Sequence, residues 1–320
     1  MVKSYSNKKL FLFFTIVFFL LCLILYYFYT CRQVDGMSII LNDGTTDEDM
    51  YGESVNKDGY LDGIDVIYYI NLDRSVGRRN HMERILNDSV FDDILTNRVP
   101  AYDGKKIDMS KYFVIDNVGN KDNSNVTNIE YACLMSHLES IRTFSESPNE
   151  IALIFEDDMT LEYKKYWHDT VGKIIKKAPS DWGIIQMCYN NINGLYFNEE
   201  YKVNMNNDAN DKNYAACAGA YIINKKSAIK LMQNIYKNGK YHINNLYYHV
   251  SDVLIFTVLK TYVYNKPYFT YITDNTSTIH QDHVSGHVLS KNIITNYLDN
   301  LFSKNAQSVT QNADASIIIR

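Results

Sequence analysis

A stretch of twenty residues without a charge, Leu10–Tyr29, constrains this chain more than any other part of its sequence. Twenty helical residues span about 30 Å, the thickness of the hydrocarbon core of a membrane. Lys3, Lys8 and Lys9 precede the stretch, whereas the six residues after it carry no net charge. By the positive-inside rule, the N-terminus then stays cytosolic and the rest of the chain crosses the membrane.

The competing interpretation of this stretch is a cleaved signal peptide. The apolar region of such a peptide would be shorter, and Tyr-Thr-Cys-Arg at its end offers no small-x-small cleavage site. The sequence therefore predicts a transmembrane signal anchor in a single-pass type II membrane protein, with the body lumenal or extracytoplasmic.

Changes in composition predict the remaining divisions of the chain. Residues 1–9 form a cytosolic tail, residues 10–29 the anchor, and residues 30–62 an acidic stem that is rich in Asp, Glu and Gly. Residues 63–290 form the globular body, and residues 291–320 a C-terminal extension. With 46% hydrophobic residues, the chain has ample material for a core.

Charge and cysteine usage exclude several classes of protein. A net charge of −5 argues against a nucleic-acid binder, which needs a basic surface to contact phosphates. The five cysteines are scattered and form no CxxC pair, so neither a zinc site nor a disulfide framework is indicated. We expect them to be buried free thiols.

Strand and helix patterns alternate along the body. Short apolar runs predict buried strands, and apolar residues at helical spacing predict helices between them. Thr127 and Glu130 form a capping box, so a helix should begin there and end before Pro148. This alternation predicts an α/β domain with a mostly parallel sheet. The expected strands are 65–71, 98–104, 151–155, 183–188 and 220–223, and the other expected helices follow Ser75 and span 227–236.

Glu156, Asp157 and Asp158 directly follow the buried strand 151–155. Adjacent carboxylates repel one another, so a fold that clusters them usually supplies a cation. Alternation along an extended segment puts Glu156 and Asp158 on one side, where they could share Mn²⁺ or Mg²⁺. A solvated acidic turn is the alternative.

A basic segment follows the first strand of the body. Asn71 and Arg74 lie at the end of that strand, and Arg78 and Arg79 lie at the start of the next helix. A helix N-terminus and nearby guanidinium groups both bind phosphates, so the segment indicates a nucleotide diphosphate ligand. Solvated arginines on a helix surface are the alternative.

These motifs, in this order, resemble glycosyltransferase family 25, which includes bacterial lipooligosaccharide galactosyltransferases and procollagen hydroxylysine galactosyltransferases. The resemblance runs from about Ile64 to His280, and one departure is Ala132, where the family tends to have Gly. The segments that carry it are Ile70–Arg74 with Arg78 and Arg79, Pro100–Gly104, Glu130–His137, Leu153–Asp158, and Ala220–Ile223 followed by Ala228 and Leu231.

The resemblance implies a GT-A-like transferase that inverts the anomeric centre of a nucleotide sugar. The usual donor is UDP-galactose, with UDP-glucose as the alternative, and residues 63–290 are then the glycosyltransferase domain. The acceptor hydroxyl belongs to a glycan or to a protein such as a collagen-like hydroxylysine. Glu156 and Asp158 would hold the metal, Mn²⁺ or Mg²⁺. The substrate-binding residues would be Asn71, Arg74, Arg78, Arg79, Ser136, His137, Asp157 and Tyr221.

Inversion in one displacement needs a general base to take the proton of the acceptor hydroxyl. Asp252 is the candidate, because it lies downstream of the metal motif beside an apolar run; a helix-capping Asp is the alternative. His137 either hydrogen-bonds the substrate or braces the site. His280 is the candidate for a late metal ligand, in a histidine cluster that is otherwise a surface turn.

Two other classes of function are compatible with the sequence. One is a catalytically degenerate transferase fold that binds glycans, although an intact acidic triplet argues against it. The other is a metal-dependent phosphoryl-transfer or hydrolytic enzyme, although the chain has no GxxxxGK[ST] loop.

Overall fold

The computed structural model describes residues 59–191, 200–203, 215–273 and 284–317. The chain divides into two units, residues 1–54 and 55–320, and all described residues belong to the second. The predicted tail, the predicted anchor and most of the predicted stem lie outside the described residues. Within the described ranges, no helix is long and apolar enough to cross a membrane.

The first strand, helix and strand of the body follow the sequence pattern. β1 (Val66–Asn71) is buried along its whole length, as its β-branched and aromatic residues predict. α2 (Val76–Ile85) begins after Ser75, which holds the N-cap position without a side-chain cap bond. A short 3-10 helix (Ser89–Phe91) leads into β2 (Leu95–Pro100). These elements confirm the predicted order at the start of the domain.

Among the described residues, the central sheet contains seven strands in the order β2-β1-β4-β8-β6-β11-β7. Its pairings give β2, β1, β4, β6 and β11 one direction and β8 and β7 the opposite one. The sheet is therefore mostly parallel, as predicted, within a mixed α/β fold. The remaining strands of this sheet are β4 (Ile151–Glu156), β6 (Ile184–Gln186), β7 (Tyr201–Val203), β8 (Ala220–Asn224) and β11 (Thr261–Tyr264).

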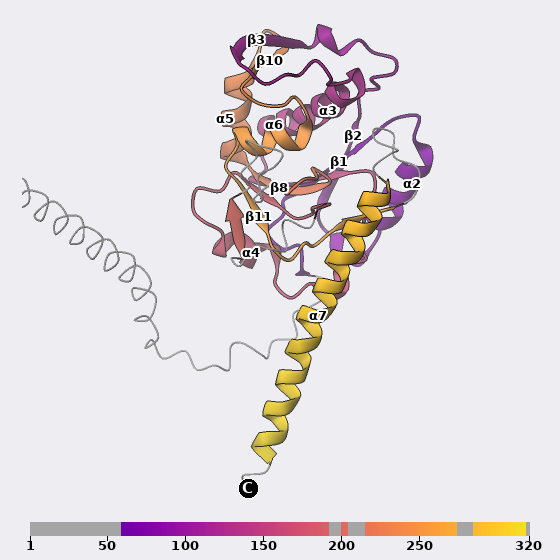
Figure 1. Cartoon of the computed structure of the whole chain (residues 1–320), viewed down its shortest axis with the longest axis vertical. Coiled ribbons are helices and arrows are strands. Elements are labelled where there is room, and N and C mark those ends of the chain that lie inside the picture. Colours follow the sequence, from indigo (N-terminus) through magenta and orange to yellow (C-terminus); the bar gives the residue numbers. More distant parts are fainter. Residues whose placement is uncertain (1–58, 192–199, 204–214, 274–283, 318–320) are drawn as a thin grey trace, which may run out of the picture. The chain divides into compact units, whose positions relative to one another are not determined.

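Helices cover both faces of the central sheet, because successive strand residues point to opposite sides. Tyr68 and Ile154 join a core with α3 (Asn128–Glu146), α5 (Lys225–Ile235) and α6 (Ser251–Val258). Figure 1 shows these three helices between the central sheet and a small sheet that contains β3 (Phe113–Gly119) and β10 (Lys240–Asn245). The alternate residues of the same strands form a second core with α2 and α4 (Val171–Lys177).

Two small sheets complete the set of strands within the described residues. One contains β3 (Phe113–Gly119), β10 (Lys240–Asn245) and β9 (Tyr236–Lys237), and the other pairs β12 (Thr270–Tyr271) with β5 (Met159–Thr160). Two further 3-10 helices span Met109–Lys111 and Lys164–Tyr166.

α3 begins at the predicted capping box. The Thr127 hydroxyl accepts the N–H of Glu130, and the Glu130 carboxylate accepts the N–H of Thr127 at 2.7 Å. The helix ends at Glu146, two residues before Pro148, which disfavours helical backbone at the residue before it. This long helix carries Ser136 and His137 on the face of the central sheet that it covers.

Near both ends of the body, packed elements cross the boundaries that composition predicts at 62/63 and at 290/291. Leu61, placed by composition in the stem, is 1% exposed and packs in the core. α7 (Val284–Ile317) runs without a break across the predicted boundary at 290/291. Its Ile294 and Leu298 are buried against Tyr163 and Tyr166, so the first part of the extension packs on the body.

Candidate active site

Three strand ends meet at one edge of the central sheet. β1 lies between β2 and β4 and is parallel to both, with Asn71 opposite Pro100 and Ile70 opposite Glu156. The carboxyl ends of these strands therefore deliver the β1–α2 turn, the segment after β2 and the acidic triplet to the same place. Ligands of open α/β sheets bind at such edges.

Asn71 holds this edge together from the end of β1. Its side chain is buried, and its amide nitrogen donates to the Asp157 carboxylate at 2.7 Å and to the Ser75 carbonyl at 3.2 Å. Its amide oxygen accepts a hydrogen bond from Arg98 at 3.1 Å. These hydrogen bonds join the end of β1 to the β1–α2 turn and to Asp157, so Asn71 holds the turn against the acidic triplet.

Arg98, on β2, is a site residue that the motif analysis missed. Besides the Asn71 side chain, it donates to the Asn71 carbonyl at 3.0 Å and to the Asp73 carboxylate at 2.5 Å. The sequence did contain a signal for this role, because Arg98 is a charged residue inside a short predicted strand. Where such a strand is half-buried, a charged side chain needs a partner of opposite charge or a hydrogen-bond acceptor.

Arg78 pairs with the acidic triplet. Its guanidinium lies 2.8 Å from an oxygen of Asp157 and 3.4 Å from an oxygen of Asp158. Asp157 therefore has two donors, Asn71 and Arg78. These contacts show that the triplet is not a solvated turn and that Arg78 is not a solvated surface residue.

Asp158 is less well satisfied than its neighbour. Its Oδ1 is buried and has no hydrogen-bond partner among the described residues. Burial, and then the charge of Glu156, raise the pKa of Asp158 to about 7. A divalent cation would relieve both conditions, because it would bind the orphaned oxygen and offset the clustered negative charge.

Glu156 is oriented by a buried chain of hydrogen bonds. His137 Nε2 lies 3.0 Å from Glu156 Oε1, and His137 Nδ1 lies 3.2 Å from the Tyr221 hydroxyl. Burial raises the pKa of Tyr221, which keeps its hydroxyl protonated and able to donate to Nδ1. Nε2 then carries the proton that His137 donates to Glu156.

The pKa of Glu156 is lowered by this environment. Burial alone would raise it, but the hydrogen bond from His137 and the positive charges of Arg78 and His287 outweigh that effect. Glu156 is therefore ionised under neutral conditions and available to a cation. His137 and Tyr221 are both fully buried, so they brace Glu156 from behind.

Two further residues of α3 face the site. Cys133 lies one turn before His137, and a sulfur, nitrogen and oxygen atom of Cys133, His137 and Glu156 all lie within 4.8 Å of one another. Burial raises the pKa of the Cys133 thiol, so it stays protonated. The Ser136 hydroxyl donates to the Ala132 carbonyl at 2.7 Å and accepts the Tyr102 N–H at 3.0 Å, which ties the segment after β2 to α3.

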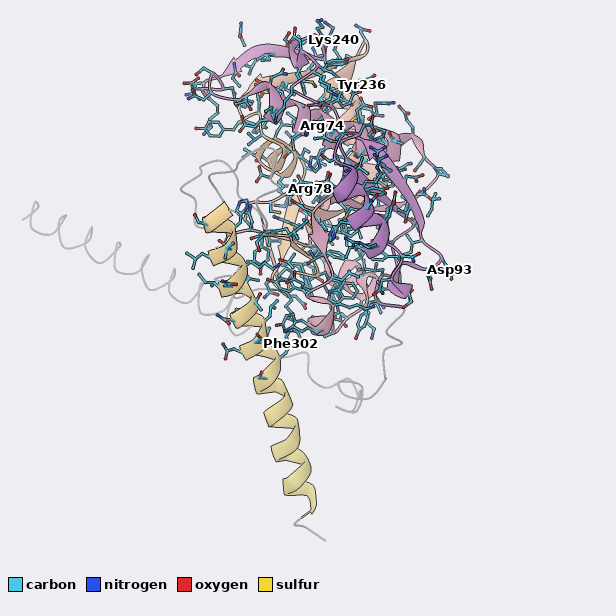
Figure 2. All side chains as sticks on the ribbon, turned by 90° about the vertical axis from the view of Figure 1, so that its right-hand side faces the viewer. Arg74, Arg78, Asp93, Tyr236, Lys240 and Phe302 are labelled. Carbon is cyan, nitrogen blue, oxygen red and sulfur yellow. The ribbon has the colours of Figure 1, made fainter. Side chains whose placement is uncertain are left out.

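Arg74 and Arg79 differ in their relation to the site. Arg74 donates to Asp103 at 2.8 Å across the site, whereas Arg79 donates to the Asp73 carbonyl and does not line the pocket described below. Figure 2 shows Arg74 and Arg78 near the beginning of α2. Asp103, which belongs to the Pro100–Gly104 motif but was not predicted as a site residue, is thereby a site residue.

A pocket opens between these elements. The β1–α2 turn, the segment after β2, one face of α3 and the start of the acidic triplet surround it. Arginines, carboxylates and apolar side chains such as Leu72 and Ile129 all line it, which suits a ligand with both a charged and an uncharged part. Its lining residues include Arg74, Ser75, Arg78, Asp103, Cys133, Ser136, His137, Glu156 and Asp157.

The sequence matches the model of glycosyltransferase family 25, described as an LPS biosynthesis protein family, over residues 64–247. This match covers more than half of the chain and includes every pocket-lining residue named above. The chain belongs to glycosyltransferase family 25. No curated protein matches the sequence. The predicted family is thus confirmed, and family membership supports a glycosyltransferase, which binds a sugar donor and an acceptor.

Asp252 lies beyond the region matched by the family 25 model, in the first turn of α6. One of its carboxylate oxygens accepts the Cys217 N–H at 3.1 Å. The neighbouring Ser251 hydroxyl lies 3.6 Å from the Cys133 sulfur, which lines the pocket. The start of α6 is therefore close to the pocket, on the side of α3.

The predicted late metal ligand, His280, lies outside the described residues, as does His283. His287 of the same cluster is described: its Nε2 lies 3.3 Å from the Asn190 side chain, and it contributes to lowering the pKa of Glu156. At least one member of the cluster therefore acts electrostatically on the acidic triplet. Its position could not be inferred from sequence spacing, because it depends on where α7 begins.

Proposed function

We propose that this family 25 protein is an inverting, metal-dependent hexosyltransferase with a GT-A-like fold. It moves a hexose, galactose in the first instance and glucose as the alternative, from a UDP-sugar to a hydroxyl of a glycan or protein acceptor. A collagen-like hydroxylysine is one such acceptor. The observation that carries the proposal is the acidic triplet at the carboxyl edge of the sheet, with the buried, unpartnered Oδ1 of Asp158 beside the ionised Glu156.

Glu156 and Asp158 are the proposed ligands of Mn²⁺ or Mg²⁺. Carboxylate oxygens are the donors that these hard cations prefer, so the residues present fit the group. When bound, the cation would neutralise negative charge on a diphosphate. His137 keeps the Glu156 carboxylate in one orientation through a hydrogen bond to one of its oxygens.

The β1–α2 turn is the proposed site of the diphosphate. The start of α2 presents backbone N–H groups, and Arg74 and Arg78 line the same pocket. Arg78 already holds Asp157 and Asp158, so it would bridge the metal-binding carboxylates and the phosphates. Arg98 holds this turn in place, because it donates hydrogen bonds to the side-chain oxygen and the carbonyl of Asn71.

Asp252 is the proposed general base. The Cys217 N–H fixes one oxygen of its carboxylate at the start of α6, next to the wall of the pocket formed by Cys133. Asp252→Asn should depress kcat with little change in UDP affinity, because a base acts only in the transition state. A loss of UDP affinity in proportion to kcat would make Asp252 a donor-site or structural residue instead.

The apolar run at residues 10–29 supports a proposal for location. We infer a type II membrane protein whose body is lumenal or extracytoplasmic, because three lysines precede an uncharged stretch long enough to cross a bilayer. The membrane would then concentrate the enzyme near acceptors that pass along the same surface.

The function is tested by measuring UDP release from a panel of UDP-sugars, with Mn²⁺, Mg²⁺ or chelator, in the presence and absence of candidate acceptors. Acceptor-dependent release of UDP from UDP-galactose or UDP-glucose, lost in chelator, is expected. Binding of UDP-sugars without turnover would indicate a degenerate transferase. Release that is independent of acceptor, with free sugar or phosphate as product, would indicate a hydrolytic enzyme.

A further inference from the structure

Two cysteines that are far apart in sequence face each other beside the active site. Cys188 follows β6, and Cys217 precedes β8, which pairs antiparallel with β6. Their sulfur atoms lie 3.7 Å apart. Cys188 is fully buried, whereas Cys217, taken as a whole residue, is partly exposed to solvent. The two thiols therefore meet at the end of a strand pair.

The backbone around both cysteines is held firmly in this arrangement. The Gln186 side-chain amide nitrogen donates to the carbonyls of Cys188 and Cys217, at 3.0 Å each, and to that of Ala215 at 3.1 Å. The Asn190 N–H also donates to the Ala216 carbonyl at 3.2 Å. These bonds clamp the segment before β8 onto the segment after β6.

Cys217 has an unusual backbone conformation that turns its sulfur inward. Its φ angle is 105°, in the region that L-residues rarely adopt, and the Gly219 N–H donates to its sulfur at 3.3 Å. A disulfide has an S–S distance of about 2.05 Å, so the sulfurs need to approach by less than about 2 Å.

We propose that Cys188 and Cys217 are a modification site at which the two thiols are oxidised to an intramolecular disulfide. The oxidant is a small-molecule disulfide such as glutathione disulfide. The Cys217 thiolate attacks one of its sulfurs and releases one glutathione thiolate. The Cys188 thiolate then attacks the Cys217 sulfur and releases the second. The two protein thiols lose two protons and two electrons, and the glutathione disulfide becomes two molecules of glutathione.

The disulfide would fix backbone that the active site uses. The Cys217 N–H donates to Asp252, and the Gly219 carbonyl accepts the Glu156 N–H at 2.9 Å. Cross-linking at Cys217 thus restrains the segment between the proposed base and the proposed metal ligand.

The disulfide would also stabilise the fold, because it closes a loop between positions 29 residues apart in the unfolded chain. From loops of this size we expect a rise in Tm of about 5–10 °C.

The direct test is a peptide map of the full chain. The protein is purified in reductant, incubated with glutathione disulfide, blocked with N-ethylmaleimide and digested with trypsin without reductant. Trypsin separates the two cysteines into residues 178–202 and 213–225, each with one cysteine. We expect these two peptides to be joined in the oxidised sample and separate after addition of dithiothreitol.

Variants provide the matched controls. Cys188→Ser should abolish both the joined peptide and the difference in Tm between oxidised and reduced protein. Cys133→Ser should retain both, because the Cys133 sulfur contacts Ser251 and belongs to neither peptide. Separate, alkylated peptides in oxidised wild-type protein, or joining of either peptide to Cys133, would overturn the proposal. Neither result depends on which sugar the enzyme transfers.

Discussion

Replacing Asp158 by Asn should stabilise the metal-free protein above neutral pH, even though it removes a carboxylate from the proposed active site. Burial, then the charge of Glu156, raise the pKa of Asp158 from 3.8 to about 7, and its Oδ1 has no partner among the described residues. Asn keeps the shape of the side chain and removes the charge.

The direction of the effect follows from the protons bound by each state. The folded protein keeps the proton of Asp158 up to about pH 7, whereas the unfolded chain releases it near 3.8. The stability contributed by this proton is fully present below 3.8 and is lost as the pH rises to about 7. Above that pH the fold carries a buried charge, which Asp158→Asn removes.

The size of the effect can be worked from the same shift. One pKa unit corresponds to about 1.4 kcal/mol, so the full shift corresponds to about 4 kcal/mol in the free energy of unfolding. The Asp158 side chain is 22% exposed, so water screens part of this, and we expect a gain of about 2–4 kcal/mol at about pH 8. The gain should shrink towards zero as the pH falls to about 4.

The assay is urea unfolding in chelator across this pH range. Asp157→Asn is the matched control, because Asp157 accepts hydrogen bonds from both Asn71 and Arg78 and its substitution leaves one donor unpaired. It should destabilise the protein by about 1–3 kcal/mol. If Asp158→Asn were destabilising at about pH 8, or if its effect did not vary with pH, the electrostatic account of the triplet would be wrong.

Three further predictions concern the brace behind Glu156, the start of α3 and the topology. Tyr221→Phe leaves His137 Nδ1 buried without its donor, so urea unfolding should show a loss of about 1–3 kcal/mol and kcat should fall; an unchanged unfolding midpoint would contradict this. Thr127→Ala removes a capping-box hydroxyl and should cost about 1 kcal/mol in the same assay, and a neutral result would show that the cap does not hold α3. In sealed microsomes the body should resist added protease until detergent is present, and digestion in intact vesicles would refute the type II topology.

Local features of the sequence predicted the elements of this fold well. The apolar run 151–155 became the buried strand β4, and Thr127 and Glu130 fixed the start of α3, because burial and capping are encoded by adjacent residues. The family motifs also drew attention to the sheet edge that holds the acidic triplet. A mostly parallel sheet followed from the alternation of strands and helices.

Contacts between distant segments could not be predicted in this way. His137 and Tyr221 are 84 residues apart and meet only because β8 inserts antiparallel beside β4. Arg98 reaches the site because β2 pairs with β1, and the order of strands in a sheet cannot be predicted from local sequence patterns. The approach of Cys188 and Cys217 has the same origin, in the pairing of β6 with β8.

The central claim is that Glu156 and Asp158 bind a divalent cation that in turn binds the diphosphate of a UDP-sugar. Titration calorimetry of UDP, with Mn²⁺ and with chelator, tests it most directly. We predict that Mn²⁺ tightens UDP binding by at least about tenfold, about 1.4 kcal/mol, in the wild-type protein and not in Asp158→Asn. Equal affinities for UDP with and without Mn²⁺ in the wild-type protein, or an undiminished effect of Mn²⁺ in Asp158→Asn, would contradict it.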